Sequence, residues 1–239
     1  MNKCLFTTYI IRVIIKMVIF MNKLNILYED NHIIVVVKPY NVLSQGDDTN
    51  DKDMLTIIKE YLKEKYNKPG NVYLGLVHRL DRPVGGVMVF AKTSKAASRL
   101  SELVRINALH KNYLAIVHGK TLDKEVLIDK ISKDEKTNNS YIDLDNGKES
   151  ILEYTTLYYD KDKDLSLVDV DLKTGRHHQI RLQMSNRGFP LYGDQRYGLG
   201  EKAQIALFAY KLRFIHPVTK EEMEFKYLPD WEILKEVNL

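Results

Sequence analysis

The chain has 239 residues, of which 44% are hydrophobic and 28% are charged, and its formal net charge at pH 7 is +4. This composition is typical of a globular protein with a sizeable core, in one large domain or two small ones. Cys4 is the single cysteine, which excludes an intrachain disulfide and a zinc site built from cysteines and suits a reducing cytoplasm.

The first twenty residues form an apolar segment that differs from the rest of the chain. Leu5 to Phe20 is apolar but short for a membrane span, and it is interrupted by Arg12 and Lys16. It lacks a small-residue cleavage site at its end, which argues against a secretory signal. Our hypothesis is that Met21 is the natural start and that residues 1–20 are an extension. The alternatives are an added strand and a membrane-surface segment.

The first regular elements are predicted shortly after Met21. Residues 33–37 form a β-branched run that ends at Pro39, which predicts a buried strand. Residues 52–66 place apolar side chains at helical spacing, and Asp51 or Asp53 is a suitable cap.

The middle of the chain predicts a strand, a helix and a second strand. Residues 87–91 are uniformly apolar and indicate a buried strand. Residues 94–106 gather apolar side chains on one helical face, with Thr93 or Ser94 as the cap. Residues 112–117 then indicate another strand.

The second half of the chain is dominated by predicted strands. We expect strands over residues 141–144, 152–158 and 165–172, and a hairpin formed by residues 205–215 and 223–227. A helix is expected over residues 176–186 with Gly188 as its stop, and a short final helix over residues 230–237. Because helices interrupt the strands without regular βαβ alternation, the pattern indicates an α+β fold with a mostly antiparallel, mixed sheet and flanking helices.

Residues 75–86 form the most informative run, Gly-Leu-Val-His-Arg-Leu-Asp-Arg-Pro-Val-Gly-Gly. Asp81 lies between two arginines, which favour its ionised form, and an ionised carboxylate is a candidate nucleophile. Gly85 and Gly86 allow a tight turn or the close approach of another backbone. Since a buried strand comes next, we expect Asp81 at the lip of a sheet.

This run and four others resemble the signature of the RluA-type RNA pseudouridine synthases. The five motifs occur in the family's order: Lys38-Pro39, His78-Arg79-Leu80-Asp81, Lys111-Asn112-Tyr113-Leu114-Ala115, Gly175-Arg176-His177-His178-Gln179-Ile180-Arg181, and Tyr192-Gly193-Asp194 with Tyr197-Gly198. The chain departs from the family at residues 83–86, where Asp-Thr-Ser-Gly is frequent, and at His177, where Thr is frequent. These departures concern the shape of the pocket and the subgroup.

The resemblance implies a pseudouridine synthase-like catalytic domain over residues 21–239, without a separate RNA-binding domain. The implied activity is isomerisation of specific uridines in ribosomal or transfer RNA, with a stem-loop as the RNA partner. No cofactor and no metal are expected, because the reaction adds nothing and changes no oxidation state. We further expect a cytoplasmic protein, a monomer, without membrane association.

Three residues are implied to carry the chemistry. By resemblance Asp81 is the essential aspartate, whether it attacks the anomeric carbon, attacks carbon 6 of the base or assists an elimination. Arg181 would hold that carboxylate, since its planar fork suits carboxylates. Tyr113 would stack on uracil and is a candidate to take the proton of carbon 5. The alternatives are a turn aspartate paired with Arg82, a phosphate-binding arginine and a core tyrosine.

Six further residues are predicted to contact RNA: Arg79, Arg82, Lys38, Arg176, His178 and Gln179. By resemblance Arg79 takes part in flipping the target base out of its stack. Lys38 has a structural alternative, and His78 is expected to form a structural hydrogen bond. Residues 173–196 hold five cations and one acid, which would attract a polyanion, although a solvated face is the plainer interpretation.

Two other functions compete with RNA isomerisation. The first is a non-catalytic RNA-binding module that keeps the same fold. The second is a metal-assisted hydrolase that uses Asp81 with His78, His177 and His178, because neutral imidazole is a common metal ligand. Adjacent histidines are expected on different helix faces, and the His-Glu-x-x-His spacing is missing, so the sequence argues against the second function.

Overall fold

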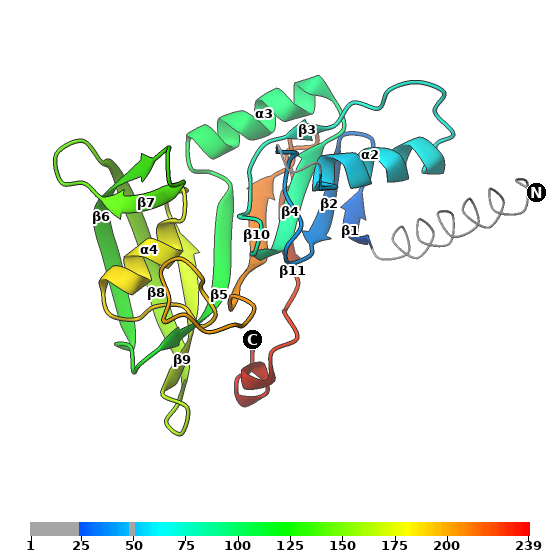
Figure 1. Ribbon diagram of the computed structural model, residues 1–239. Helices are drawn as coiled ribbons and strands as arrows, with labels where there is room; N and C mark the ends of the chain where they lie inside the picture. Colours follow the sequence, from blue (N-terminus) through cyan, green and yellow to red (C-terminus); the bar gives the residue numbers. More distant parts are fainter. Residues whose placement is uncertain (1–23, 48–50) are drawn as a thin grey trace, which may run out of the picture.

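Figure 1 shows a computed structural model of the protein, which describes residues 24–47 and 51–239. The expected N-terminal extension over residues 1–20 lies outside the described residues. Eleven strands in the described part form one sheet, and helices pack on both of its faces. None of the helices described is long and apolar enough to cross a membrane.

The elements succeed one another with helices between groups of strands. The strands are β1 (Asn25–Glu29), β2 (Ile33–Lys38), β3 (Gly75–Leu76), β4 (Gly85–Ala91), β5 (His110–His118), β6 (Lys124–Asp134), β7 (Asn139–Ile142), β8 (Lys148–Asp160), β9 (Leu165–Leu172), β10 (Leu207–Ile215) and β11 (Glu222–Lys226). The helices are α2 (Met54–Lys65), α3 (Ser94–Arg105), α4 (Gln179–Asn186) and the 3-10 helix η1 (Glu232–Glu236).

The sheet confirms the predicted α+β class. Its strands lie in the order β1-β2-β4-β10-β5-β9-β8-β6-β7, with β11 beside β10 and β3 beside β4. The described pairings are antiparallel except for a short parallel contact between β4 and β10. Because β4 and β10 run in the same direction, the loop that precedes β4 lies beside the segment that precedes β10.

Gly86 makes that parallel contact possible. It pairs with Ala209, and its φ of 136° is a conformation that other L-residues rarely adopt. A Cβ atom at Gly86 would also collide with the main chain of Ala209. The expectation that the glycine pair admits another backbone is therefore confirmed, and the backbone is that of β10.

Alternate side chains of β5 point to opposite faces of the sheet. Tyr113, Ala115 and Val117 join the core that includes side chains of α2 and α4. Leu114 and Ile116 join the opposite core, with side chains of η1, while α3 packs on β2 and β4 on that same face. The β5 tyrosine therefore lies on the face that α4 covers (Figure 1).

Two of the predicted helices begin at their expected caps. The Asp53 carboxylate accepts a hydrogen bond from the main-chain N–H of Thr56 at 2.7 Å, and the Thr93 hydroxyl accepts one from Ala96 at 3.2 Å. The prediction for α4 began three residues too early, because His178 takes a left-handed conformation with φ 52°. Gly188 ends that helix region with φ 82°, as predicted.

The remaining differences concern edges and short elements. Strands β1 and β6 were not predicted, because neither has the uniformly apolar run of a central strand. The strand predicted over residues 141–144 is β7, which starts two residues earlier and ends before Asp143, whose side chain caps the next turn. The final helix is the short 3-10 helix η1.

Candidate active site

Asp81 lies in the loop between β3 and β4, and its neighbours fix the main chain of that loop. Leu80 and Val84 are buried on either side, and the Val84 N–H donates to the Asp81 carbonyl at 3.0 Å. The buried hydroxyl of Ser44 donates to the Leu80 carbonyl at 2.8 Å and accepts from the Leu80 N–H at 3.1 Å. The Asp81 side chain itself stays 28% exposed. The loop is therefore fixed while its carboxylate remains accessible.

Lys38 also holds the main chain of this loop, which is the structural role that the sequence offered as the alternative to RNA contact. Its side chain is fully buried, and its ammonium donates to the carbonyls of Pro39 at 3.1 Å, Val42 at 2.5 Å and Arg82 at 3.1 Å. Burial lowers the pKa of Lys38 to about 7. With all three donors directed at carbonyls, no N–H of Lys38 is left to contact an RNA phosphate.

Arg181 extends from α4 and is anchored mainly by Asp194. Its Nε donates to Asp194 Oδ2 at 2.8 Å and its Nη2 to Asp194 Oδ1 at 2.6 Å, a bidentate pair. The remaining nitrogen, Nη1, lies 3.3 Å from Asp81 Oδ2. The Arg181 side chain is only 4% exposed. The Asp194 carboxylate thus holds the guanidinium in place, and the remaining nitrogen of the guanidinium faces the Asp81 carboxylate.

Asp194 lies in the fifth of the sequence motifs, but sequence reasoning gave it no role in the site. It is fully buried, and its Oδ1 also accepts the main-chain N–H groups of Arg196 at 2.9 Å and Tyr197 at 3.2 Å. Burial acts to raise the pKa of Asp194, but the Arg181 pair and these N–H groups outweigh it and lower the pKa. The available signal was that Asp194 is the single acid among residues 173–196.

Tyr113 lies in the middle of the sheet, paired with Ala209 of β10 and Val170 of β9. Burial, with a smaller contribution from the negative charge of Asp81, raises its pKa. The phenol is therefore protonated at neutral pH. Its ring is held by the core on the α4 face, close enough to Asp81 for the negative charge of that carboxylate to raise the pKa of the phenol.

His178 and His177 do not lie on different helix faces, as the sequence had suggested. They precede α4, and their rings lie against each other with centroids 3.7 Å apart and planes tilted by 32°. His178 Nδ1 is 3.0 Å from the Tyr197 hydroxyl, and its Nε2 is 3.6 Å from Asp81 Oδ2. Because His178 is buried beside Asp81, its contact is with that carboxylate rather than with the surface where RNA would lie.

Asp81, His177 and His178 lie close together, but the residues of the metal-hydrolase alternative do not form a metal-binding group within the described part of the chain. His78 Nε2 accepts the main-chain N–H of Val89 at 3.1 Å, which is the structural hydrogen bond expected of it. Burial lowers the pKa of His78 to about 3, so its ring is neutral. Over residues 24–47 and 51–239, no group of three His, Cys, Asp or Glu side chains is placed to hold a metal ion.

The other predicted RNA contacts divide into exposed arginines and one buried amide. Arg82 pairs with Asp51 at 2.6 Å rather than with Asp81, and Arg176 Nε donates to a main-chain carbonyl at 3.1 Å. Exposed Arg79 forms no hydrogen bond or ion pair with any described residue. Gln179 is buried, and its Oε1 accepts the Arg176 N–H at 3.0 Å. The three arginines are thus exposed, whereas Gln179 is buried in the turn before α4.

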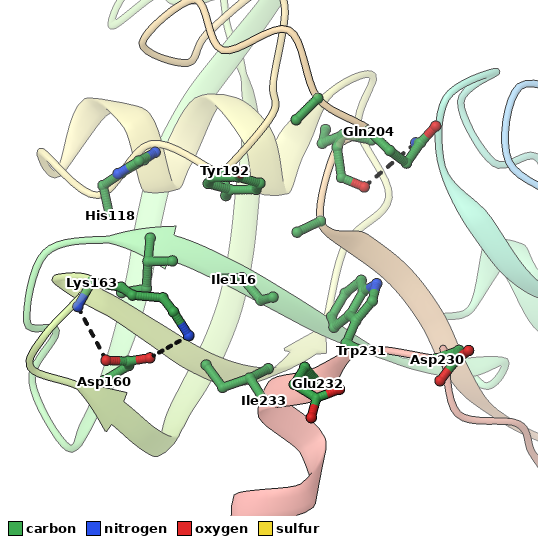
Figure 2. Close-up of a pocket in the computed structure, with 14 residues that line it drawn as sticks. Ile116, His118, Asp160, Lys163, Tyr192, Gln204, Asp230, Trp231, Glu232 and Ile233 are labelled. Carbon is green, nitrogen blue, oxygen red and sulfur yellow. Dashed lines mark hydrogen bonds and ion pairs between the residues drawn. The ribbon is translucent and has the colours of Figure 1, made fainter.

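A separate cavity of about 770 Å³ lies on the opposite face of the sheet (Figure 2). Tyr192, Trp231 and Ile116 are among its lining residues, and Ile116 faces away from the side of β5 that carries Tyr113. None of Asp81, Tyr113 and Arg181 lines it. Gln204 links the cavity to the catalytic loop, because its Nε2 donates to the Pro83 carbonyl at 2.7 Å.

The matching family model and the similar proteins are all RNA pseudouridine synthases. Residues 32–186 match the model of the family described as RNA pseudouridylate synthase. The chain is 32% identical over 202 residues to "Uncharacterized RNA pseudouridine synthase YhcT" of Bacillus subtilis, covering 83% of this chain and 66% of that one. It is 30% identical to "Ribosomal large subunit pseudouridine synthase D" of Xanthomonas campestris, covering 83% and 63%.

A relative that is matched over 94% of its length has a different name. The chain is 32% identical to "tRNA pseudouridine synthase C" of Haemophilus ducreyi over 235 residues, covering 89% of this chain and 94% of that one. Among solved structures, "Human RNA Pseudouridylate Synthase Domain Containing 4" superposes with a TM-score of 0.73 at 23% identity, over 90% of this chain and 94% of that chain. At that identity the superposition shows a shared fold.

Proposed function

The chain belongs to the RNA pseudouridylate synthase family, a class of isomerases, and we propose that it converts a uridine of structured RNA to pseudouridine at Asp81. One observation carries the proposal. The Asp81 carboxylate is partly exposed, lies 3.3 Å from a guanidinium that Asp194 holds in place, and shares the α4 face of the sheet with Tyr113. A binding module needs no such preorganised carboxylate.

The reaction balances without any external reactant. The bond between C1′ of the ribose and N1 of uracil breaks, and a bond between C1′ and C5 forms. C5 loses a proton and N1 gains one, so no electron is supplied or consumed. Asp81 begins this sequence as the ionised group next to the bound uridine, by attack on C1′, by attack on C6 or by assisting elimination. Arg181 stabilises that ionised form.

Tyr113 supplies the surface on which the detached base turns. Its ring is fixed by the central strands, so it can stack on uracil without first losing conformational freedom. Its raised pKa keeps the phenol protonated, so the resting hydroxyl is not a phenolate base. It takes part in the removal of the C5 proton only by passing on its own proton at the same time.

Arg79, Arg82 and Arg176 are the exposed cations that we assign to RNA contact. Arg79 is two residues before Asp81 and without a partner among the described residues, so it can enter the space that the flipped uridine vacates. Arg82 and Arg176 would contact phosphates and set the register of the RNA.

We infer that the first RNA to test is a transfer RNA stem-loop, with ribosomal RNA second. The match to the transfer RNA synthase covers 94% of that relative, whereas the match to the ribosomal RNA synthase covers 63%. Single-stranded loops are also where proteins reach unstacked bases in RNA. We further propose that residues 21–239 act as one catalytic domain, for which the continuous sheet is the support. A cytoplasmic location and a monomeric state remain part of the same proposal.

The test is direct conversion of RNA by the purified protein. The protein is incubated with transcribed transfer RNAs and ribosomal RNA fragments, and pseudouridine is mapped at single-nucleotide resolution. We expect product at one or a few defined uridines, and we expect Asp81→Asn to lower turnover by roughly a thousandfold or more while RNA binding persists. RNA binding without product from the wild-type protein would support the binding-module alternative. Activity that a chelator abolishes would support the hydrolase alternative.

A further inference from the structure

The side chain of His178 is enclosed beside the catalytic carboxylate, although the proposed chemistry gives it no role. Its φ of 52° turns the chain just before α4 and directs the ring between Tyr197 and Asp81. The side chain is 6% exposed. A left-handed backbone is uncommon outside glycine but is less costly for histidine than for most residues, and the contacts with Tyr197 and Asp81 hold the ring in this placement.

The contacts of Tyr197 determine which nitrogen of His178 carries the proton. The Tyr197 hydroxyl oxygen accepts the main-chain N–H of Ser140 at 2.7 Å. Its own proton then has two acceptors in reach: His178 Nδ1 at 3.0 Å and the Ser140 carbonyl at 3.4 Å. The shorter contact favours donation to Nδ1. With that donation Nδ1 is the acceptor, and the geometry favours the neutral tautomer whose proton is on Nε2, the nitrogen that faces Asp81.

Burial, together with the charged groups around it, keeps the His178 ring neutral. Burial lowers the pKa of His178 to about 3, and the positive charge of Arg181 adds to this effect. His177 and Arg196 act in the same direction, whereas Asp194 opposes them weakly. Asp81 faces Nε2 across 3.6 Å, a distance at which a neutral N–H is a poorly formed donor in the protein without substrate.

We propose that His178 is a positioning residue for Asp81, whose neutral Nε2–H closes onto the carboxylate when uridine binds. Hydrogen bonds to a catalytic group are often long in the free enzyme and tighten in the substrate complex. Arg181 Nη1 and His178 Nε2 both lie near Asp81 Oδ2, at 3.3 and 3.6 Å, so together they fix the orientation of one oxygen and leave the other free to react.

Tyr197 links the two donors. The Arg181 guanidinium lies over the Tyr197 ring at 5.3 Å from its centroid, while the hydroxyl of the same ring contacts His178. Main-chain N–H groups of residues 196 and 197 bind Asp194, so the segment that locks Arg181 also positions Tyr197. One turn of the chain thus orients both groups that face Asp81.

The first test needs no RNA and so does not depend on the proposed function. Nitrogen-15 NMR of the imidazoles in the full chain reports the tautomer of each histidine, with His178→Asn used to assign the signal. We expect His178 to be neutral with its proton on Nε2 between about pH 5 and about pH 8. We also expect Asp81→Asn to shift that N–H signal. A proton on Nδ1, or a charged ring at neutral pH, overturns the proposal.

The second test compares two substitutions of His178, to asparagine and to glutamine. One suits the backbone better, and the other places its amide better for contact with Asp81. Asparagine tolerates the left-handed backbone but places its amide near Nδ1, away from Asp81. Glutamine is less suited to that backbone, but its amide reaches the position of Nε2. A positioning role therefore makes His178→Gln more active than His178→Asn, whereas a purely structural role makes His178→Asn the better variant.

We expect His178→Asn to lower kcat by about tenfold to a hundredfold with KM for RNA unchanged, and His178→Gln to recover most of that loss. His216→Asn, at a buried histidine beside Asp30, is the matched control and should leave kcat unchanged. Equal activity of the two variants, or a loss confined to KM, overturns the proposal.

This inference rests on the proposed function for its kinetic part only. A wild-type protein that isomerises none of the RNAs refutes the proposed function, while the NMR result still decides the orientation of His178. A wild-type protein that is active, with His178→Asn at wild-type kcat, refutes the positioning role alone.

Discussion

The loop that carries Asp81 and the helix that carries Arg181 meet at one carboxylate, but the two regions hold their side chains differently. The loop is fixed through its main chain by Ser44, Lys38 and Val84, while the Asp81 side chain remains 28% exposed. The helix side is fixed through its side chains, with Arg181 and Asp194 buried and paired twice. The comparison indicates which group reacts and which group supports it.

The two regions also differ in how they use a buried histidine. His78, on the loop side, accepts a main-chain hydrogen bond from β4. His178, on the helix side, faces Asp81. Burial lowers the pKa of each to about 3. The same residue type in the same charge state is thus structural on one side and directed at the reactive carboxylate on the other.

Breaking the anchor on the helix side should have the largest effect. Asp194→Asn leaves the Arg181 charge buried without its partner, which costs about 3–5 kcal/mol of unfolding free energy. Activity should fall with it, because Arg181 is no longer held in place. Chemical denaturation and turnover measure the two effects. Glu102→Gln, which breaks the exposed pair with Arg105, is the control and should leave stability nearly unchanged because solvent screens that pair.

Removing one hydroxyl separates stacking from proton transfer at Tyr113. Tyr113→Phe keeps the ring, so RNA affinity should be unchanged, while turnover should fall by about a hundredfold because the C5 proton has lost its route. Single-turnover kinetics with a labelled uridine provides the measurement. Tyr210→Phe, on the opposite face of the sheet, is the matched control. Wild-type turnover in Tyr113→Phe would restrict Tyr113 to stacking.

The two histidines predict how stability depends on pH. Each has a pKa of about 3 when folded and 6.5 as its ordinary value, so the unfolded chain binds more protons between these limits. The free energy of unfolding should therefore fall as the pH decreases from about 6.5, by about 1.4 kcal/mol per pH unit for each histidine.

A substitution on the loop side isolates one of these contributions. His78→Gln can still accept the Val89 N–H but does not titrate, so the slope between about pH 6 and about pH 5 should decrease by about 1.4 kcal/mol per unit. Urea unfolding at the two pH values gives the slope. An unchanged slope would mean that His78 is not buried as a neutral ring.

The smallest effect is expected at the accessible edge of the loop. Arg79→Ala should leave stability within about 0.5 kcal/mol of wild type, since Arg79 has no partner among the described residues. Turnover on a folded stem-loop should fall by about fivefold, but turnover on an unstructured RNA should change little, because its uridine is already unstacked. Arg105→Ala on α3 serves as the surface control. Equal losses on both RNAs would argue against a role in flipping.

Local patterns predicted a large part of the fold. The buried runs at β2 and β4, the caps Asp53 and Thr93 and the stop at Gly188 each depend on a few neighbouring residues, and all are present in the structure. Strand β6 was missed because exposed Val126 and Ile128 interrupt the alternation that marks a half-buried strand. The start of α4 was misplaced because the left-handed His178 is stabilised by tertiary contacts.

The sequence by itself determined the order of the motifs, the candidate carboxylate and the arginine placed opposite it, because these are properties of residue type and spacing. The tertiary structure decided the partners. In the folded protein the Arg181 guanidinium forms its bidentate pair with Asp194, and Lys38 is buried among main-chain carbonyls. The His178 ring faces Asp81. Such pairings depend on which polar groups are buried together and must satisfy one another, and no linear pattern encodes that.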